Sequence, residues 1–172
     1  MSRVRTGLDR VSDGDSKAVR LVEGRRVGVL THAASVDSEL RPCVDILRSA
    51  GANIAALFGP EHGYFGAAQD MVGVGSADGS GVPVHSLYGD DAADLSPKPE
   101  WVREMDAVVV DLQDVGSRYY TYVWTAALMM KVAASVGTEV IVLDRPNPLG
   151  GVRVEGAPQR DGYLSFVGLY PV

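Results

Sequence analysis

Four separated segments of this 172-residue chain place acids, amides and basic groups directly after short apolar runs. They are GPEHG at 59–63, YGD at 88–90, DLQDVGSR at 111–118 and DRPNP at 144–148. Carboxylates, a histidine, amides and guanidinium groups suit general acid–base chemistry on a polar, anionic small substrate, provided that they meet in one place. Scaffolding alone rarely needs four such clusters, although an aspartate at a strand end often only caps the next helix.

Glu61 is the carboxylate of most interest, because it stands between Pro60 and Gly63 directly after an apolar run. A carboxyl group held against apolar walls keeps its proton toward neutral pH and can then serve as a general acid. The simpler interpretation is that Glu61 caps a turn or a helix. Both interpretations are open at the level of the sequence.

The segment 111–118 also has a structural interpretation. Gln113 and Asp114 are well placed to cap the long apolar helix that follows, where an acidic side chain is favourable, and Arg118 would then be a surface residue. In the segment 144–148, two prolines stiffen a polar loop that either belongs to a binding site or only redirects the chain. The aromatic residues after Arg118 favour a core or interface role over a sugar-binding platform; they are Tyr119, Tyr120, Tyr122 and Trp124.

Charge and motif content exclude several classes of protein. A net charge of −6 and a pI of about 5.0 argue against a nucleic-acid backbone as the main partner. The sequence contains no P-loop, no dinucleotide-binding glycine fingerprint and no G-x-S-x-G nucleophile turn, so we expect no cofactor. The three histidines are scattered and no strong metal-ligand set is present, so no metal is expected. A carboxylate–histidine metal site made of Glu61, His62 and Asp111 stays open as an alternative.

Five short apolar runs predict the strands that would position these groups. They cover residues 26–31, 53–58, 83–87, 107–112 and 139–143. Helical stretches separate most of them, which is typical of parallel β-α units with both faces of the sheet covered. We therefore predict one α/β domain over residues 1–172, with an open, mostly parallel, Rossmann-like sheet of about five strands and helices on both faces. Ligands bind such sheets beyond the carboxyl ends of the strands.

Four helices are predicted around these strands, over residues 15–23, 37–50, 98–105 and 119–136. The second would begin at a cap on Asp37 or Ser38. Its apolar face would then carry Leu40, Val44 and Leu47.

The chain is predicted to have no membrane span. Its longest apolar run is far below the ~20 residues that a spanning helix needs. Residues 1–10 carry three arginines with no apolar stretch behind them, so no export signal is visible and we expect a cytoplasmic location.

Several stretches together resemble one known family. The four most specific are GPEHG at 59–63, DLQDVGSRYYTY at 111–122, LDRPNPLGG at 143–151 and VEG at 154–156. The stretches GLDRV at 7–11, RVGVLTH at 26–32 and FVGLYPV at 166–172 extend the similarity over nearly the whole chain. With these motifs the sequence is similar to the NamZ (YbbC) family. Its members are exo-β-N-acetylmuramidases, which remove N-acetylmuramic acid from the non-reducing end of peptidoglycan fragments.

The resemblance implies roles for individual residues. Glu61 would be the general acid, with His62 beside it, and Asp114 or Asp144 would stabilise the oxocarbenium-like centre, position water or orient the 2-acetamido group. Carboxyls ~5–5.5 Å apart would favour retention of configuration and ~6.5–9.5 Å inversion. An arginine fork would recognise the lactyl carboxylate of muramic acid. The residues expected to line the pocket are Gln113, Arg118, Asp144, Arg145 and Asn147.

The family pairs an N-terminal Rossmann-like domain with a C-terminal domain across the active-site cleft. The chain resembles the N-terminal domain alone, so we expect one wall of the cleft to be missing. The expected partners are that C-terminal domain and, as substrate, a muropeptide or a MurNAc-GlcNAc sugar. The segment THAAS at 31–35 departs from the Asn-Pro turn of many relatives, and some relatives are exported.

Three alternatives remain open. The chain could be a non-catalytic binding module for acidic sugars, which keeps the arginines and dispenses with the acid. It could be a metal-dependent hydrolase that uses Glu61, His62 and Asp111. It could also be a scaffold that is inactive until it pairs with a second chain.

Overall fold

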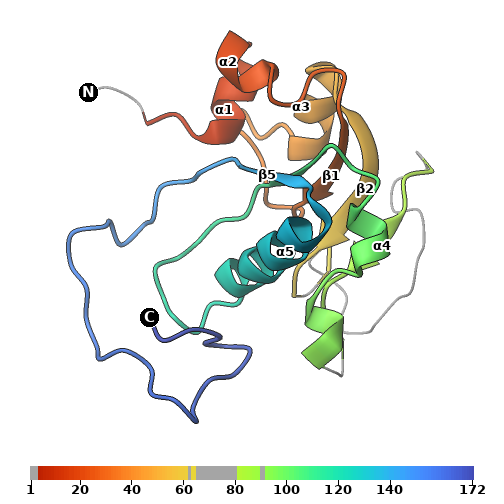
Figure 1. Ribbon diagram of the computed structural model, residues 1–172. Helices are drawn as coiled ribbons and strands as arrows, with labels where there is room; N and C mark the ends of the chain where they lie inside the picture. Colours follow the sequence, from red (N-terminus) through yellow and green to blue (C-terminus); the bar gives the residue numbers. More distant parts are fainter. Residues whose placement is uncertain (1–3, 62, 65–80, 90–91) are drawn as a thin grey trace.

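The computed structural model describes residues 4–61, 63–64, 81–89 and 92–172, without the side chains of 92–93 (Figure 1). Five strands form one all-parallel sheet in the order β3-β2-β1-β4-β5, which confirms the predicted open α/β fold. The strands coincide with the five predicted runs to within a few residues; they are β1 Arg26–Leu30, β2 Asn53–Gly59, β3 Val84–Ser86, β4 Ala107–Val110 and β5 Glu139–Val142.

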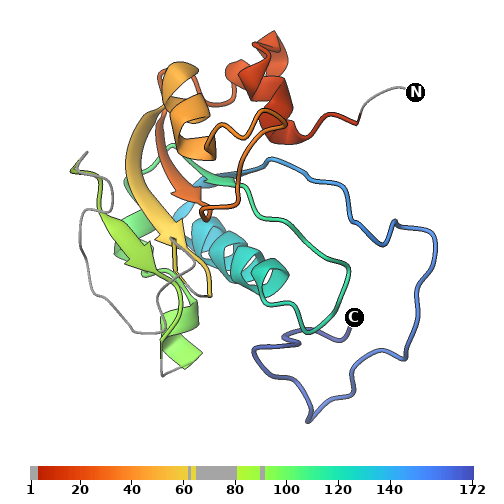
Figure 2. The same cartoon turned by 180° about the vertical axis from the view of Figure 1, so that it is seen from behind.

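Helices cover both faces of the sheet (Figure 2). On one face α1 (Gly7–Ser12), α2 (Ser16–Val19) and α3 (Cys43–Ser49) bury an aliphatic core that includes Val27 and Val29. A second core fills the opposite face beneath α4 (Pro99–Val102) and α5 (Tyr122–Val136). It contains Leu30, Phe58, Val108, Val110 and Met129. The short 3-10 helix η1 is Ala92–Leu95.

One irregularity interrupts the pairing of β1 with β2. Val27 pairs with Ile54, but the next residue of β1, Gly28, pairs with Ala56, so Ala55 is an extra residue in β2. Ile54 and Leu57 therefore belong to the same core, although they are three positions apart, and Phe58 joins the other core. The bulge thus absorbs the extra residue, and the end of β2 faces the same layers as its partners in β1.

The helix predicted over 37–50 is wrong in its first six residues. The carboxylate of Asp37 accepts the backbone N–H groups of Glu39 and Arg41 at 2.9 and 2.8 Å, which folds residues 37–41 into a turn. Leu40 has a positive φ of 63° and is 78% exposed, so it does not join the buried face of α3. Aspartate competes with helical hydrogen bonding in this way when its side chain bonds the backbone two residues ahead.

The remaining helix predictions need smaller corrections. Residues 15–23 form only the single turn of α2, and α1 before it was not predicted. The helix α1 begins at a reciprocal capping box, in which Thr6 and Asp9 each bond the other's backbone N–H. The prediction over 98–105 is confirmed only for α4, and the long helix α5 begins at Tyr122 and ends at Gly137.

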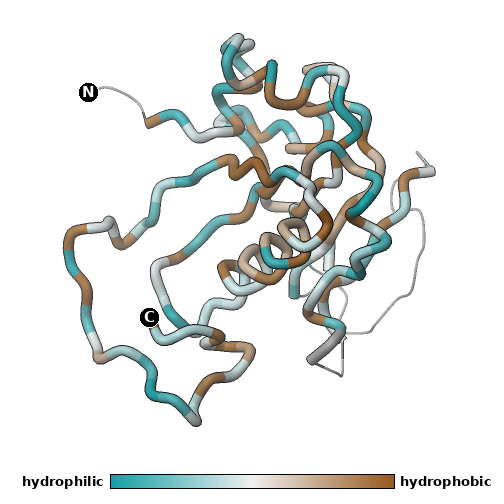
Figure 3. The backbone as a smooth tube through the Cα atoms, viewed as in Figure 1, coloured by the Kyte–Doolittle hydropathy of each residue, from teal (hydrophilic) through white to brown (hydrophobic). Residues whose placement is uncertain are grey.

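The chain beyond β5 leaves the sheet in a wide loop and returns toward α5 (Figure 1). Residues 150–158 are all exposed, including the apolar Val152 and Val154. Figure 3 shows apolar stretches distributed along this loop. None of the helices that the structure describes is long and apolar enough to cross a membrane.

Candidate functional site

The candidate site lies at the carboxyl edge of the sheet, where the strand order changes direction. The chain winds from β1 through β2 to β3 on one side and then continues with β4 and β5 on the other side of β1. In parallel α/β sheets the crevice at such a reversal is the usual place for a ligand. Segments that follow β1, β2, β4 and β5 all contribute polar side chains here.

A buried ion pair joins three of these segments. The guanidinium of Arg145 donates through Nε and Nη2 to both carboxylate oxygens of Asp111, at 2.6 and 2.9 Å. Its Nη2 also donates to the carbonyl of Val36 at 3.0 Å, and the Ser35 hydroxyl donates to the Asp111 carbonyl at 2.6 Å. The Asp111 side chain is fully buried. Arg145, predicted to bind substrate, is therefore engaged inside the protein.

The same pair argues against the metal alternative. Both Asp111 oxygens accept hydrogen bonds from a cation, so they are not available as metal ligands. Within the described part of the chain, no group of three or more histidine, cysteine or acidic side chains is arranged to hold a metal ion. His62, the third residue of that alternative, lies outside the described residues.

A tight turn after β2 presents Glu61. The Gly63 N–H donates to the Pro60 carbonyl at 2.8 Å, and Gly63 has a positive φ of 72°. A Cβ at Gly59 would come within 2.5 Å of the Tyr64 backbone nitrogen, so a residue with a side chain does not fit there. At this turn the Thr121 hydroxyl donates to Glu61 Oε2 at 2.6 Å. Glu61 thus contacts the start of α5.

Two tyrosines stand beside Glu61. The Tyr122 ring lies 4.7 Å from that of Tyr120, between centroids. Burial, followed by Tyr120 and the Glu61 carboxylate, raises the pKa of Tyr122 to about 12. Burial also raises the pKa of Tyr120, and the charges of Asp114 and Glu61 act in the same direction. The charges of Glu61 and Asp114 thus both favour the neutral form of the Tyr120 phenol group.

His32 is a further aromatic group here that the sequence analysis did not select. Its ring meets Tyr122 edge to face at 5.0 Å between centroids. Burial, together with the charge of Arg145, lowers its pKa below the ordinary 6.5 against the opposing effect of Asp111. The position of His32 directly after the first strand, the same signal that selected the other clusters, would have identified it.

The segments after β4 and β5 also pack against each other away from the ion pair. Gln113 donates from Nε2 to the Pro146 carbonyl at 3.0 Å. Gly116 has a positive φ of 74°, and a Cβ there would lie 2.6 Å from Asn147 Oδ1. Asn147 accepts the Leu149 N–H at 2.9 Å. The two segments that carry Gln113 and Asn147 thus contact each other, and a shared pocket for these two residues stays a prediction.

Arg118 and Asp144 differ in their surroundings. Arg118 is exposed and donates to the Ala157 carbonyl at 2.7 Å, and among the described residues no carboxylate pairs with it. Asp144 is exposed at the beginning of the tail, and its carbonyl accepts the Gly7 N–H beside α1 at 2.9 Å. Arg118 is thus the predicted basic residue whose charge is open to an anion.

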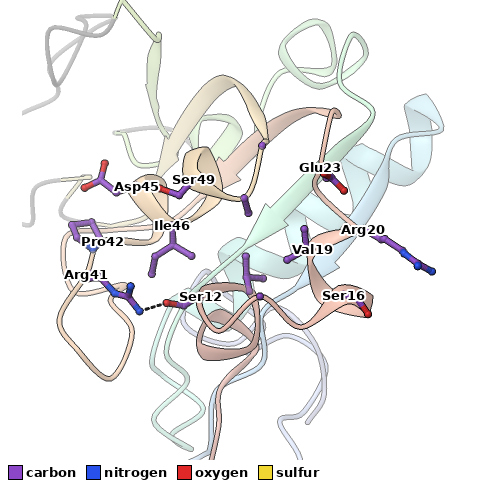
Figure 4. A pocket seen from close by; sticks show the side chains of 14 residues that line it. Ser12, Ser16, Val19, Arg20, Glu23, Arg41, Pro42, Asp45, Ile46 and Ser49 are labelled. Carbon is purple, nitrogen blue, oxygen red and sulfur yellow. Dashed lines mark hydrogen bonds between the residues drawn. The ribbon is translucent and has the colours of Figure 1, made fainter.

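Two spaces are lined by described residues. Beside Glu61, a small space of about 10 Å³ is lined by groups from α5 and by Phe166 and Leu169 of the tail. A cavity of about 790 Å³ opens instead between α1, α2 and α3 (Figure 4). There Ser12 and Arg41 are joined by a hydrogen bond, and Val19 and Ile46 contribute apolar surface. The larger cavity contains none of the predicted site residues, so we assign the site by its chemical groups.

Comparisons with known proteins identify one family. The model of the family described as "Exo-beta-N-acetylmuramidase NamZ, N-terminal" matches residues 27–172. Peptidoglycan β-N-acetylmuramidase NamZ of Bacillus subtilis (strain 168) is 43% identical over 173 residues, which covers 99% of this chain and 40% of that protein.

Two crystal structures of DUF1343 family proteins from Bacteroides fragilis NCTC 9343 share the fold. They have TM-scores of 0.85 and 0.77 and sequence identities of 39% and 29%. In each case the match covers 99% of this chain and 42% of the other. The chain thus spans about 40% of the length of these relatives.

Proposed function

Since this chain belongs to the NamZ exo-β-N-acetylmuramidase family, matching its N-terminal domain, we propose that it supplies the acid–base side of a glycosidase active site. The reaction would be hydrolysis of the bond that joins a non-reducing-end N-acetylmuramic acid to the next sugar of a peptidoglycan fragment. The observation that carries this proposal is the hydrogen bond from Thr121 to Glu61 at the carboxyl edge of the sheet. The charges of Glu61 and Asp114 both contribute to the raised pKa of Tyr120.

Glu61 is the proton donor in this mechanism. It protonates the glycosidic oxygen as the bond to the leaving sugar breaks, which neutralises the alkoxide that would otherwise form. Asp114 is the better candidate for the second carboxylate, because its charge reaches the same phenol group as that of Glu61, whereas Asp144 lies near the beginning of α1. Asp114 would stabilise positive charge at the anomeric carbon, position water, or orient the acetamido group.

Arg118 is the proposed recognition group for the lactyl carboxylate of the sugar. A protein with a net charge of −6 repels an anion unless a local cation attracts it. Arg145 is engaged by Asp111, while the only described partner of the Arg118 guanidinium is a neutral carbonyl. A guanidinium group matches a carboxylate with two parallel hydrogen bonds.

A second domain completes the cleft in this proposal. The space of about 10 Å³ that Glu61 shares with α5 and the tail does not hold a sugar ring, and the relatives are more than twice as long as this chain. The exposed apolar side chains of the tail, such as Val152 and Tyr163, supply surface that another domain would cover. The isolated chain is therefore expected to gain activity when the remaining part of a relative is added.

Substitution of Glu61 tests the proposal. We expect Glu61→Gln to reduce the hydrolysis of a chromogenic β-N-acetylmuramide by roughly 10²–10⁴-fold, because the proton donor is lost. The assay would contain the chain with the remaining domain of the B. subtilis relative. Glu100→Gln, an exposed glutamate in the first turn of α4, is the matched control and should keep normal turnover. Wild-type turnover in Glu61→Gln would reject the acid role.

The exposed Arg118 also favours a second candidate function, a non-catalytic module that binds acidic sugars. Calorimetry with N-acetylmuramic acid distinguishes the two. Binding that depends on Arg118, without turnover in the presence of the second domain, would favour the binding module.

A further inference from the structure

We propose that Thr121 is a positioning residue, which holds Glu61 in the orientation for proton transfer through its hydroxyl group. The proposal rests on the function proposed above, and it concerns a residue that is not among the predicted catalytic or binding residues. Its basis is the hydrogen bond of 2.6 Å from Thr121 Oγ1 to Glu61 Oε2.

Thr121 does not use its hydroxyl group to cap the helix that it begins. A threonine at the N-cap ordinarily accepts a backbone N–H from two or three residues ahead with its side chain. Thr121 is the N-cap of α5 but makes no such bond. Its carbonyl alone receives the N–H groups of Trp124 and Thr125, both at 3.0 Å. The hydroxyl is thus withheld from capping and bonds the carboxylate.

The backbone around Thr121 is held by side-chain hydrogen bonds at the beginning of α5. Trp124, which is 5% exposed, donates from its indole nitrogen to the Arg118 carbonyl at 2.9 Å. The Thr125 hydroxyl donates to the Thr121 carbonyl at 3.2 Å. The carboxylate of a short turn is thereby attached to the end of a 15-residue helix. A catalytic acid needs this kind of support, because small displacements of a reacting group cost rate steeply.

The hydroxyl group of Thr121 can bond a carboxyl group in either protonation state. A hydroxyl is both a donor and an acceptor. It can donate to the Glu61 carboxylate and accept from the protonated carboxylic acid. Thr121 can therefore bond Glu61 Oε2 as a donor when that oxygen is bare and as an acceptor when that oxygen carries the proton.

The experiment compares Thr121→Val with Thr121→Ser in the same hydrolysis assay. Valine has nearly the shape of threonine without the hydroxyl, and serine keeps the hydroxyl. We expect Thr121→Val to lower kcat by about 10- to 100-fold with KM changed less than about 2-fold, since one hydrogen bond to a charged group is lost. Thr121→Ser should restore most of kcat. Thr138→Val, which removes a hydroxyl bonded to the Val102 carbonyl beyond the other end of α5, is the control and should keep normal turnover.

A measurement independent of turnover accompanies the assay. The side-chain carboxyl carbon of Glu61 is observed by ¹³C NMR and assigned through its disappearance in Glu61→Gln. We expect its signal to move in Thr121→Val and to stay near the wild-type position in Thr121→Ser and Thr138→Val. An unmoved signal in Thr121→Val would overturn the proposal, whether or not the protein hydrolyses a muramide.

The two proposals fail in different ways. If wild-type protein hydrolyses the muramide and Thr121→Val does so with the same kcat, positioning by Thr121 is wrong and the glycosidase function stands. A serine variant as impaired as the valine variant would also reject the role of the hydroxyl. If wild-type protein is inactive with the second domain present, the proposed function fails, and the NMR signal alone decides the contact between Thr121 and Glu61.

Discussion

Arg145 illustrates how a residue selected for its charge can serve a charge inside its own chain. Arg145 stands in a proline-containing segment after a strand. That position suits a residue that binds an anionic ligand as well as one that pairs with a carboxylate of its own chain. In the structure the Nε and Nη2 groups of Arg145 both donate to Asp111, and only 11% of the arginine side chain is exposed. No sequence pattern states which arginine meets which buried aspartate, because the two are 34 residues apart.

This ion pair carries a prediction about stability. Arg145→Met leaves the Asp111 charge buried without a partner, so we expect the free energy of unfolding to fall by about 3–5 kcal/mol in urea titrations. Arg10→Met breaks the exposed pair with Asp15 and should cost at most about 1 kcal/mol. Equal effects of the two substitutions would contradict the difference in burial. Replacing Asp111 by Leu in the Arg145→Met background should recover part of the loss.

The pH dependence of stability is predicted to include a contribution from Asp9. Burial opposes its ionisation, but hydrogen bonds from the Thr6 and Ser38 backbones prevail and lower its pKa well below the ordinary 3.8. Its contribution is therefore present above about pH 4 and is lost as the pH falls through the native pKa. Asp9→Asn should be about 1–3 kcal/mol less stable than wild type at pH 7, and this difference should shrink at lower pH. A difference that stays constant down to pH 2 would contradict this account.

Among the elements, strands were more predictable than short helices. The strands β1, β2 and β4 are runs of apolar residues that are buried over most of their length, so their hydrophobicity identifies them directly. Among the helices, only α5 is long enough to be recognised in the sequence, from its 15 largely apolar residues and from Gly137, which caps its end. The beginning of α3 depends on Asp37, whose side chain can either cap a helix or close a turn. Both outcomes use the same hydrogen-bonding groups, and packing decides between them.

The helix α1 was missed because its stability comes from contacts outside its six residues. Asp9 reaches the Ser38 N–H at 3.0 Å, and the Ser12 hydroxyl reaches Asp37 at 2.8 Å. Gly7 lies directly on the backbone that follows β5, where its N–H bonds the Asp144 carbonyl at 2.9 Å. An element made of one or two turns is recognisable in the sequence only when its local signals are strong.

A pair of glycine substitutions tests the docking of α1. A Cβ at Gly7 would lie 2.6 Å from the Leu143 Cα, a backbone atom that cannot move aside. We expect Gly7→Ala to lower the free energy of unfolding by about 1–3 kcal/mol, measured by urea denaturation. Gly151→Ala places the same methyl group where nothing lies within 4 Å and should change stability little. If both variants match wild type, α1 does not pack on β5 as described.

At the scale of the whole molecule, a packed sheet carries a long exposed loop. The polar clusters were predictable at one edge of the sheet, and those that contain Glu61, Asp114 and Asn147 follow the carboxyl ends of β2, β4 and β5. The sequence did not indicate which of those side chains would bond other groups of the protein, as Arg145 bonds Asp111. It also could not indicate how far the tail stands out from the sheet, because glycines and prolines interrupt any periodic pattern there.

Limited proteolysis tests this picture of the tail. Arg153 is 85% exposed on a segment without helix or strand, so trypsin should cut first after Arg153 and Arg160. Arg25 bonds the Leu21 and Asp106 carbonyls and should be cut much later. Mass spectrometry of the early fragments identifies the sites. Early cutting at Arg25 would contradict the expectation that the tail is more accessible to trypsin than the segment before β1. Slower cutting at Arg153 in the presence of a second domain would support the proposed cleft.

The extra residue Ala55 also has a bearing on the candidate site. Beyond the bulge, Leu57 and Phe58 face the same layers as their partners Val29 and Leu30, so the bulge absorbs the one additional residue without turning the end of β2 over. The turn that carries Glu61 starts from that end. Deletion of Ala55 would leave regular alternation with the same partners, so the glutamate is expected to stay on the side of the sheet where Thr121 lies.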